Sequence, residues 1–439
     1  MLSQIIFAVA LLLTIWIFGY TSSRYIKLFR ITKPAFPVRD IRKRILLTLR
    51  VAMGQSKMFR KPFTGFMHAL VFWGFLVILI GSIEMVIDGL TGSERSLKVL
   101  GGLYELIIAL GDVFALLVVI AILIFLGRRL FLHVKRFEGI EMKYISHLDA
   151  KVALSIILLL MLTLIGMNAG YVALKVAGNE PIHGVFPISK HLAGLLEGMN
   201  VVQLHLFHEI HWWAHILLIF FFANLLPYSK HFHVFMSLPN VFLSRLDPLA
   251  KLPNMDSITR EVKLMMDPET AFASAEGEAA PERFGVKDAE DVSWKNYLDS
   301  LACTECGRCT SVCPAAITGK KLSPRKIVMD LRARMREKGK GLISQGKDFI
   351  DQKALLRDYI SEEELWACTT CNACAKECPI NINQPTLIVD MRRYLVMEEG
   401  SAPGELKAVF NNIENNGAPW QYSSEDRLLW AKDIEIKKS

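Results

Sequence analysis

Two cysteine runs of identical spacing constrain this chain more than any other feature of its sequence. Both read C-x2-C-x2-C-x3-C-P, with Cys303, Cys306, Cys309 and Cys313 in the first run and Cys368, Cys371, Cys374 and Cys378 in the second. In this pattern three closely spaced thiolates hold three corners of one [4Fe-4S] cluster, and the fourth cysteine binds the other cluster. The pair therefore predicts two [4Fe-4S] clusters in one small domain.

The predicted ligand sets cross between the two runs. Cys303, Cys306, Cys309 and Cys378 hold one cluster, and Cys368, Cys371, Cys374 and Cys313 hold the other, which uses all eight cysteines. Structural zinc is a weaker alternative, because four ligands per ion would leave the third and fourth cysteine of each run without a role. A disulfide framework is weaker still, because nothing else indicates an oxidising compartment. Two neighbouring clusters indicate electron transfer.

The first half of the chain predicts a membrane domain. The sequence is 52% hydrophobic with a mean hydropathy of +0.31, which is too apolar for an ordinary soluble protein. Five apolar runs are long enough to span a bilayer, at about residues 5–20, 63–90, 103–126, 152–177 and 204–235. The first run has no basic segment before it and no small-residue cleavage site after it, so it predicts an anchor rather than a secretory signal.

The basic residues predict how the five spans are oriented. Lysines and arginines crowd the loops between spans one and two and between spans three and four, whereas the other two loops carry only Arg95, Lys98 and Lys190. The positive-inside rule places the basic loops in the cytoplasm. We therefore expect a multi-pass protein of the cytoplasmic membrane with its N-terminus outside and its iron-sulfur part in the cytoplasm. The net charge of +8 follows these loops and indicates no nucleic-acid partner.

The predicted domains are a transmembrane domain (1–240), a linker (241–292), an iron-sulfur domain (293–400) and a tail (401–439). The low-complexity stretch 271–281 predicts a flexible linker. Ser323-Pro324, the capping box from Ser361 and Gln384-Pro385 each predict a helix start, so the iron-sulfur domain should be helical. The fold class is thus all-α, a five-span bundle followed by an α-helical domain. Tryptophans in the tail favour a partner-docking segment.

Histidines in the apolar runs are functional candidates, because ionisable groups are costly in a membrane. His215 and His233 are eighteen residues apart, about five helical turns, so one continuous helix would place them on the same face about 27 Å apart. His233 then lies at the depth of His68, and the two imidazoles could hold one haem. His215 has no histidine opposite it, since the residue ten positions beyond His68 is Ile78. An interfacial cluster is expected for His205, His208 and His211.

The membrane half resembles the haem b domain of the respiratory nitrate reductase gamma subunit. The resemblance rests on residues 65–75 around His68 and on residues 212–240, from Trp212-Trp213-Ala-His215 to Leu238-Pro-Asn240. It implies that His68 and His233 bind a cytoplasmic-side haem b and that His215 matches one ligand of a second, outer haem. The position that matches the other outer ligand is Ile78.

The cysteine half resembles the iron-sulfur domain of heterodisulfide reductase C and D subunits and of the anaerobic glycerol-3-phosphate dehydrogenase C subunit. Residues 322–331 and 366–371 carry this resemblance. The two halves together resemble fused membrane iron-sulfur oxidoreductases whose longer members continue into cysteine-rich CCG domains, and residues 411–420 resemble the lead-in to those domains. The resemblance implies a separate CCG-domain subunit, of heterodisulfide reductase B type, docked by the tail.

These features predict an electron-transfer subunit that links a cytoplasmic partner to membrane quinone through the two clusters and haem b. No residue has the pattern of a substrate-converting acid, base or nucleophile, so any substrate site is expected on a partner. The family implies flavoprotein partners, and an electron-transfer-flavoprotein:menaquinone reductase is the most specific expectation. The alternatives are a heterodisulfide-type thiol-disulfide reductase subunit and a non-enzymatic redox-sensing membrane anchor.

Overall fold

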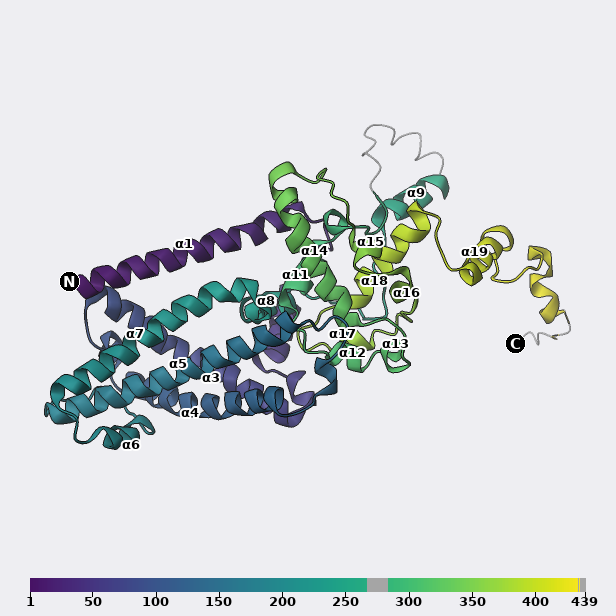
Figure 1. Ribbon diagram of the computed structural model, residues 1–439. Helices are drawn as coiled ribbons and strands as arrows, with labels where there is room; N and C mark the ends of the chain where they lie inside the picture. Colours follow the sequence, from purple (N-terminus) through teal and green to yellow (C-terminus); the bar gives the residue numbers. More distant parts are fainter. Residues whose placement is uncertain (267–282, 433, 435–439) are drawn as a thin grey trace.

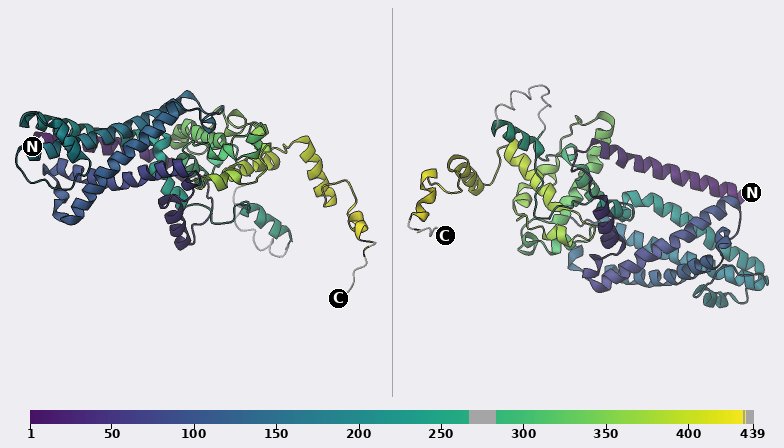
Figure 2. Two further views of the ribbon diagram at one scale, coloured as in Figure 1. Left: turned by 90° about the horizontal axis from the view of Figure 1, so that it is seen from below. Right: turned by 180° about the vertical axis from the view of Figure 1, so that it is seen from behind.

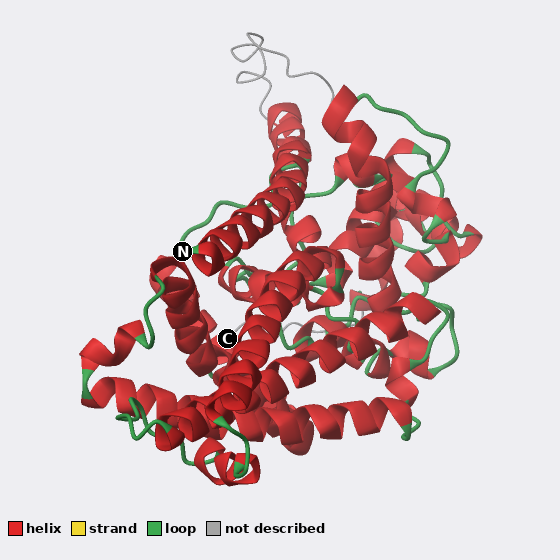
Figure 3. Cartoon of the chain, turned by 60° about the vertical axis from the view of Figure 1, so that its left-hand side comes forward, coloured by secondary structure: helices red, strands yellow, loops and turns green. Residues whose placement is uncertain are grey.

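The computed structural model describes residues 1–266, 283–432 and 434, and within these ranges the chain is helical and has no β-strand (Figures 1 and 3). Five helices are long and apolar enough to cross a membrane, which confirms the five predicted spans. They are α1 (Leu2–Ile31), α3 (Pro62–Thr91), α4 (Gly102–Leu130), α5 (Tyr144–Ala177) and α7 (Val201–Leu225). The N-terminus of the chain and the C-terminal helical domain lie at opposite ends of the bundle (Figure 1).

The bundle is organised around α5, which packs on both α4 and α7. Ala153, Leu160 and Ile165 are among the α5 side chains buried in this contact. By contrast, α1 exposes Leu12 and Trp16 along most of its length, which is expected where lipid rather than protein surrounds a helix. The structure therefore has a packed centre and a lipid-facing rim.

The fifth span differs from the expected continuous helix over 204–235. Helix α7 begins with a capping box between Asn200 and Gln203 and ends at Leu225. Pro227 then lacks the amide hydrogen that an α-helix needs, and the chain continues as two short 3-10 turns before α8 (His233–Phe242). The periodicity argument that placed His215 and His233 on one face is therefore wrong, and their relation is set by tertiary packing.

The C-terminal helical domain, residues 283–400, packs against one end of the bundle (Figures 1 and 2). Its helices are α11 (Trp294–Ala302), α12 (Arg308–Ser311), α13 (Pro314–Ile317), α14 (Pro324–Gln345), α15 (Leu355–Asp358), α16 (Glu362–Trp366), α17 (Ala373–Glu377) and α18 (Gln384–Arg393). The predicted starts are confirmed, because the Ser323 hydroxyl caps α14 and Ser361 forms a capping box with Glu364. The contacts with the membrane part run through α11, which packs on α8, and α14, which packs on α1.

The end of the expected linker belongs to this domain. Val286, Ala289 and Val292 are buried in its core, and the Asp288 carboxylate accepts hydrogen bonds from Arg334 and Lys338. The low-complexity stretch 271–281 lies outside the described residues. Before it, the chain forms helix α9 (Asp256–Met266).

Two remaining short helices precede the second and fifth spans, α2 (Ile41–Thr48) and α6 (Ser189–Ala193). The tail carries α19 (Gly404–Asn416) and a 3-10 segment (Ser424–Ala431), which extend away from the helical domain (Figure 2). No side chain of α19 is buried, and Trp420 and Trp430 are exposed.

Candidate redox sites

The structure brings Cys378 to the first cysteine run. Cys303 and Cys378 share one buried apolar cluster with Ile382, and the Cys378 thiol lies within electrostatic range of Cys306 and Cys303. Burial is the largest cause that raises the pKa of the Cys303 thiol to about 11 and that of Cys378 to about 12, and the neighbouring Cys306 thiol acts in the same direction on both. Thiols with such pKa values hold their protons at neutral pH until a metal displaces them.

Cys313 joins the second run in the same way. Cys313, Cys368, Cys371 and Cys374 line one small cavity between α13 and α17. Burial raises the pKa of the Cys374 thiol to about 12, with further contributions from Cys368 and Cys313. The structure thus brings Cys378 to the first run and Cys313 to the second, as a crossed arrangement requires, and the crossed ligand sets themselves stay a prediction.

The donor sets suit [4Fe-4S] clusters. Across residues 1–266, 283–432 and 434, no three His, Cys, Asp or Glu side chains converge closely enough to hold a single metal ion. Backbone amides point at the sulfurs, since Thr370 N lies 3.4 Å from Cys368 Sγ and Ile382 N lies 3.4 Å from Cys378 Sγ. Such N–H···S contacts tune cluster potentials. The assignment of each cysteine as a ligand remains a prediction.

The first cysteine run lies directly against the membrane part. Gly307 adopts a φ of +73°, and a Cβ at this position would lie 2.2 Å from the Arg136 carbonyl oxygen. The Arg308 guanidinium, which follows it, donates a 3.0 Å hydrogen bond to the carbonyl of Lys57 in the loop before α3. A glycine is needed here because any side chain would push the helical domain away from the loop that contains Arg136.

The candidate haem ligands, His68 and His233, lie near each other at this same end of the bundle. His68 Nδ1 lies 3.1 Å from Gln55 Oε1, and His233 Nδ1 lies 3.2 Å from the Lys230 carbonyl oxygen. The Gln55 amide donates to Ala52 O at 2.7 Å, so its oxygen is the atom that faces His68. Each Nδ1–H therefore donates, which leaves both Nε2 lone pairs free for iron. The two imidazoles are within electrostatic range of each other.

A loop connects His68 to the first cysteine set, which we define as Cys303, Cys306, Cys309 and Cys378. Lys57 Nζ donates to the Cys378 carbonyl at 3.1 Å and to Asn381 Oδ1 at 2.6 Å. Lys57 is two residues from Gln55, which binds His68. The same loop lies tightly on α3, because a Cβ on Gly65 would meet the Met58 carbonyl oxygen at 2.4 Å.

A second connection joins His233 to the same cysteine set. Lys230, whose carbonyl binds His233, extends its ammonium to Glu305 Oε2 at 3.1 Å. Glu305 lies between Cys303 and Cys306, and its other oxygen accepts from Arg332, which also donates to the Cys303 carbonyl at 2.9 Å. Burial raises the pKa of Glu305, but Arg332 and Lys230 outweigh it and leave the pKa below its usual value.

Sequence reasoning missed Glu305, Lys230 and Lys57. The available signal was a carboxylate inside the first Cys-x-x-Cys turn, together with a lysine three residues before the candidate haem ligand His233. A charge that becomes buried at such a position needs a partner of opposite charge. Only their contact across 75 residues of sequence shows that Lys230 and Glu305 belong to one interface.

Replacing Glu305 by glutamine is expected to destabilise the docked domain by about 3–5 kcal/mol, because Lys230 and Arg332 would then be buried without a countercharge. The measurement is thermal unfolding followed by loss of the visible cluster absorption. Glu363→Gln is the matched control, since its pair with Lys321 is exposed and should contribute little. Equal melting temperatures for Glu305→Gln and the wild type would contradict the prediction.

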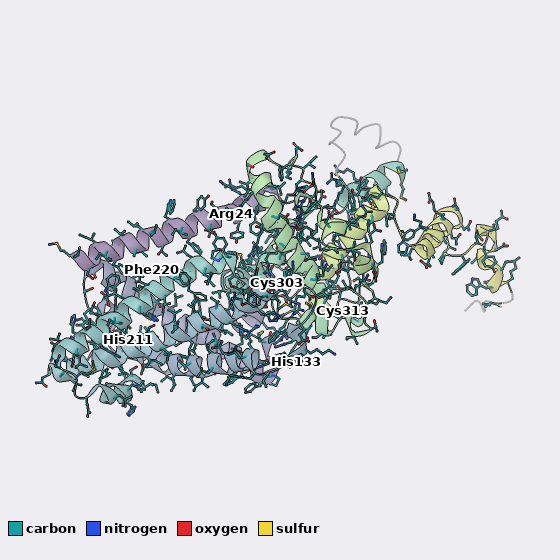
Figure 4. The ribbon with its side chains drawn as sticks, viewed as in Figure 1. Arg24, His133, His211, Phe220, Cys303 and Cys313 are labelled. Carbon is teal, nitrogen blue, oxygen red and sulfur yellow. The ribbon has the colours of Figure 1, made fainter. Side chains whose placement is uncertain are left out.

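The other membrane histidines lie at the far end of the bundle, where Figure 4 labels His211. His215 is buried, with Nδ1 2.9 Å from the Leu160 carbonyl oxygen, and it lines a cavity together with His205 and His208. His211 packs on α5 instead, where a Cβ on Gly166 would lie 2.3 Å from its ring. The expected interfacial cluster is therefore split between the cavity and a helix contact.

A family model for a 4Fe-4S dicluster domain matches residues 302–382. The chain is similar to FadF of Bacillus subtilis, a probable iron-sulfur-binding oxidoreductase, with 30% identity over 472 residues that cover 99% of this chain and 62% of FadF. It is also similar to the EtfAB:quinone oxidoreductase of Syntrophomonas wolfei subsp. wolfei, with 28% identity over 427 residues that cover 91% of this chain and 55% of the relative.

A shorter match joins the chain to a probable membrane-anchored ferredoxin of Chromohalobacter salexigens, with 36% identity over 165 residues, 35% of this chain and 25% of the relative. No solved structure matches the chain. The relatives are iron-sulfur electron-transfer oxidoreductases, and the chain spans about three fifths or less of the length of each of these three.

Proposed function

We propose that this chain is the membrane electron-transfer subunit of a quinone-linked oxidoreductase, with two [4Fe-4S] clusters in its helical domain and a haem b between His68 and His233. When bound, these groups supply one-electron redox chemistry. One observation carries the proposal. Both candidate haem ligands are joined by short hydrogen-bonded connections to the first cysteine set, His68 through the Gln55–Lys57 loop and His233 through Lys230 and Glu305.

The two cysteine sets differ in their distance from the membrane part. Cys303, Cys306, Cys309 and Cys378 contact the loops of the bundle through Arg308, Lys57 and Arg136. The second set has Cys371 exposed at the surface of the helical domain. We therefore assign the first set as the bundle-side site and the second set as the site that faces an external donor. This order supports a relay rather than two independent centres.

The donor and acceptor follow from the relatives and the basic loops. The name of the Syntrophomonas relative states oxidation or reduction of quinone together with EtfAB. We propose a flavoprotein of that class as electron source and menaquinone as acceptor, with the helical domain in the cytoplasm, where the positive-inside rule places it. His215 is not a ligand of the haem proposed here.

The tail supplies a surface for a partner subunit of CCG type, of the heterodisulfide reductase B kind. The α19 helix buries no side chain, and Trp420 and Trp430 are 58% and 74% exposed. Exposed tryptophans in a short segment are typical of a docking sequence, since aromatic residues are enriched in protein interfaces.

The test uses the full chain in vesicles that contain menaquinone. Reduced electron-transfer flavoprotein, with the partner subunit present, is expected to reduce the b haem, seen as its sharp visible absorption band, and to form menaquinol. A truncation that removes residues 411–439 should keep reduction by dithionite but lose reduction by the flavoprotein. Cofactor reduction without quinol formation from any donor would instead indicate a redox sensor, and full activity of the truncated chain would contradict docking by the tail.

A further inference from the structure

The far end of the bundle contains a cavity of about 600 Å³, within the usual range of small-molecule sites. Its lining residues come from α1, α3, α4, α5 and α7 and include Met1, Ser3 and Gln4 at the N-terminus. In Figure 1 the N-terminus lies at the end of the bundle opposite the helical domain. Val77, Ile78 and Leu164 form an apolar part of its wall, and Asp88, Glu94 and Lys175 line it elsewhere. A cavity with apolar and polar walls inside a membrane bundle suits an amphipathic ring better than an ion.

Two of the buried acids in the wall are already engaged. Glu84 accepts hydrogen bonds from Leu97 N at 3.0 Å and from the Tyr104 hydroxyl at 3.2 Å. Asp112 accepts from Ile188 N at 2.7 Å and from Ser189 N at 2.9 Å. These carboxylates hold loops in place and are not free to select a ligand.

His215 is different, because one of its ring nitrogens has no partner among the described residues. Its side chain is 1% exposed, and Nδ1 donates to the Leu160 carbonyl oxygen at 2.9 Å beside Thr163 Oγ1 at 3.0 Å. That bond leaves the Nε2 lone pair free as a hydrogen-bond acceptor, and His215 is one of the residues that line the cavity. A ligand hydroxyl is the complementary group.

The cavity does not suit a haem held by two imidazoles. All three histidines that line it, His205, His208 and His215, come from α7, and residues of one helix cannot bind both faces of a haem. The facing helix α3 presents Ile78 and Gly81 instead. Gly81 leaves open space, since nothing lies within 4 Å of a Cβ placed there.

We infer that this cavity binds the head group of the membrane quinone, whose reduced hydroxyl donates a hydrogen bond to His215 Nε2. The inference rests on the function proposed above and locates its acceptor. The quinone gains two electrons, supplied one at a time from the reduced flavoprotein, and two protons from water at this end of the bundle, and becomes the quinol. Ile78 is ten residues after His68 on α3, about 15 Å along the helix axis, so the cavity begins within reach of a haem held at His68.

Two variants of the full chain with its cofactors test the site. His215→Leu removes the acceptor, and Gly81→Leu fills the open space without touching the imidazole. Gly19→Leu is the matched control, because Gly19 also has nothing within 4 Å but lies on α1 outside the cavity. The probe is menaquinone-1, with its binding measured by calorimetry and its reoxidation of the pre-reduced haem followed optically.

Both cavity variants are expected to bind menaquinone-1 at least about tenfold more weakly and to reoxidise the haem correspondingly more slowly, with unchanged haem and iron content. Wild-type affinity in Gly81→Leu, which keeps every polar group, would overturn the inference even if His215→Leu fails to fold. Loss of one of two haems in His215→Leu would overturn it in favour of a second haem. Failure of menaquinone-1 to reoxidise the wild-type haem would instead contradict the quinone-linked function itself.

Discussion

Replacing His68 by alanine is expected to abolish the low-spin b-type haem spectrum while the iron-sulfur absorption remains. The reason is geometric. The Gln55 amide oxygen lies 3.1 Å from His68 Nδ1 and leaves Nε2 free for iron, and a haem held from one side only would lose its low-spin form or dissociate. His233→Ala should give the same result. The measurement is the dithionite-reduced minus oxidised spectrum together with the iron content.

His133→Ala is the control for both variants. His133 follows α4 at the same end of the bundle and its side chain is 77% exposed, so its replacement should leave haem and iron unchanged. A wild-type haem spectrum in either His68→Ala or His233→Ala would show that the haem is bound elsewhere. Gln55→Leu adds an intermediate case, because it removes only the group that orients His68, and an outer partner of this kind typically changes metal binding about 10–100-fold.

Cys378→Ser is expected to remove about half of the iron and to damage the same cluster as Cys306→Ser, although Cys378 belongs to the other run. The physical reason is the packing of the second run on the first, which places Cys378 near Cys303 and Cys306. Low-temperature electron paramagnetic resonance of the reduced protein distinguishes the two clusters. Cys378→Ser and Cys306→Ser should lose the same signal.

Cys374→Ser is the matched comparison, since it lies only four residues earlier on the same run. It should lose the other signal, the one lost in Cys371→Ser and Cys313→Ser, because these thiols line a common cavity. If Cys378→Ser and Cys374→Ser lost the same signal, each run would hold its own cluster and the crossed assignment would be wrong.

Much of the architecture was predictable because it depends on local patterns. Apolar runs of sufficient length specify membrane helices wherever they occur, and all five are present. Ser323, Ser361 and Gln384-Pro385 act on the backbone within three residues of themselves, so they mark helix starts without knowledge of the fold. The iron-sulfur character of the helical domain likewise follows from the cysteine spacing, and a family model for a 4Fe-4S dicluster domain matches residues 302–382.

Two expectations from the sequence were wrong, the continuous fifth helix and the extent of the linker. Helix α7 ends at Leu225, just before Pro227 and ten residues before the expected end of the apolar run, and this break invalidates a face assigned by helical periodicity. In the same way, residues 283–292 have the polar character of a linker, yet Val286 and Val292 complete the core of the helical domain. A sparse apolar pattern becomes informative only when the surface that it covers is known.

The sequence by itself determined the cofactor class of the helical domain, the number of membrane helices and the all-α fold, because each depends on residues that act within a few positions of one another. Only the tertiary structure decided which cysteine set lies against the membrane part and what connects it to His68 and His233. The order of the two cysteine sets, from the membrane part outward, is a proposal built on these contacts. The proposed order depends on two contacts, that of Lys57 with Cys378 and that of Lys230 with Glu305. The residues of the first contact are 321 positions apart in the sequence and those of the second are 75 positions apart. No local pattern encodes such distances, since they follow from how the packed helices bury their charges together.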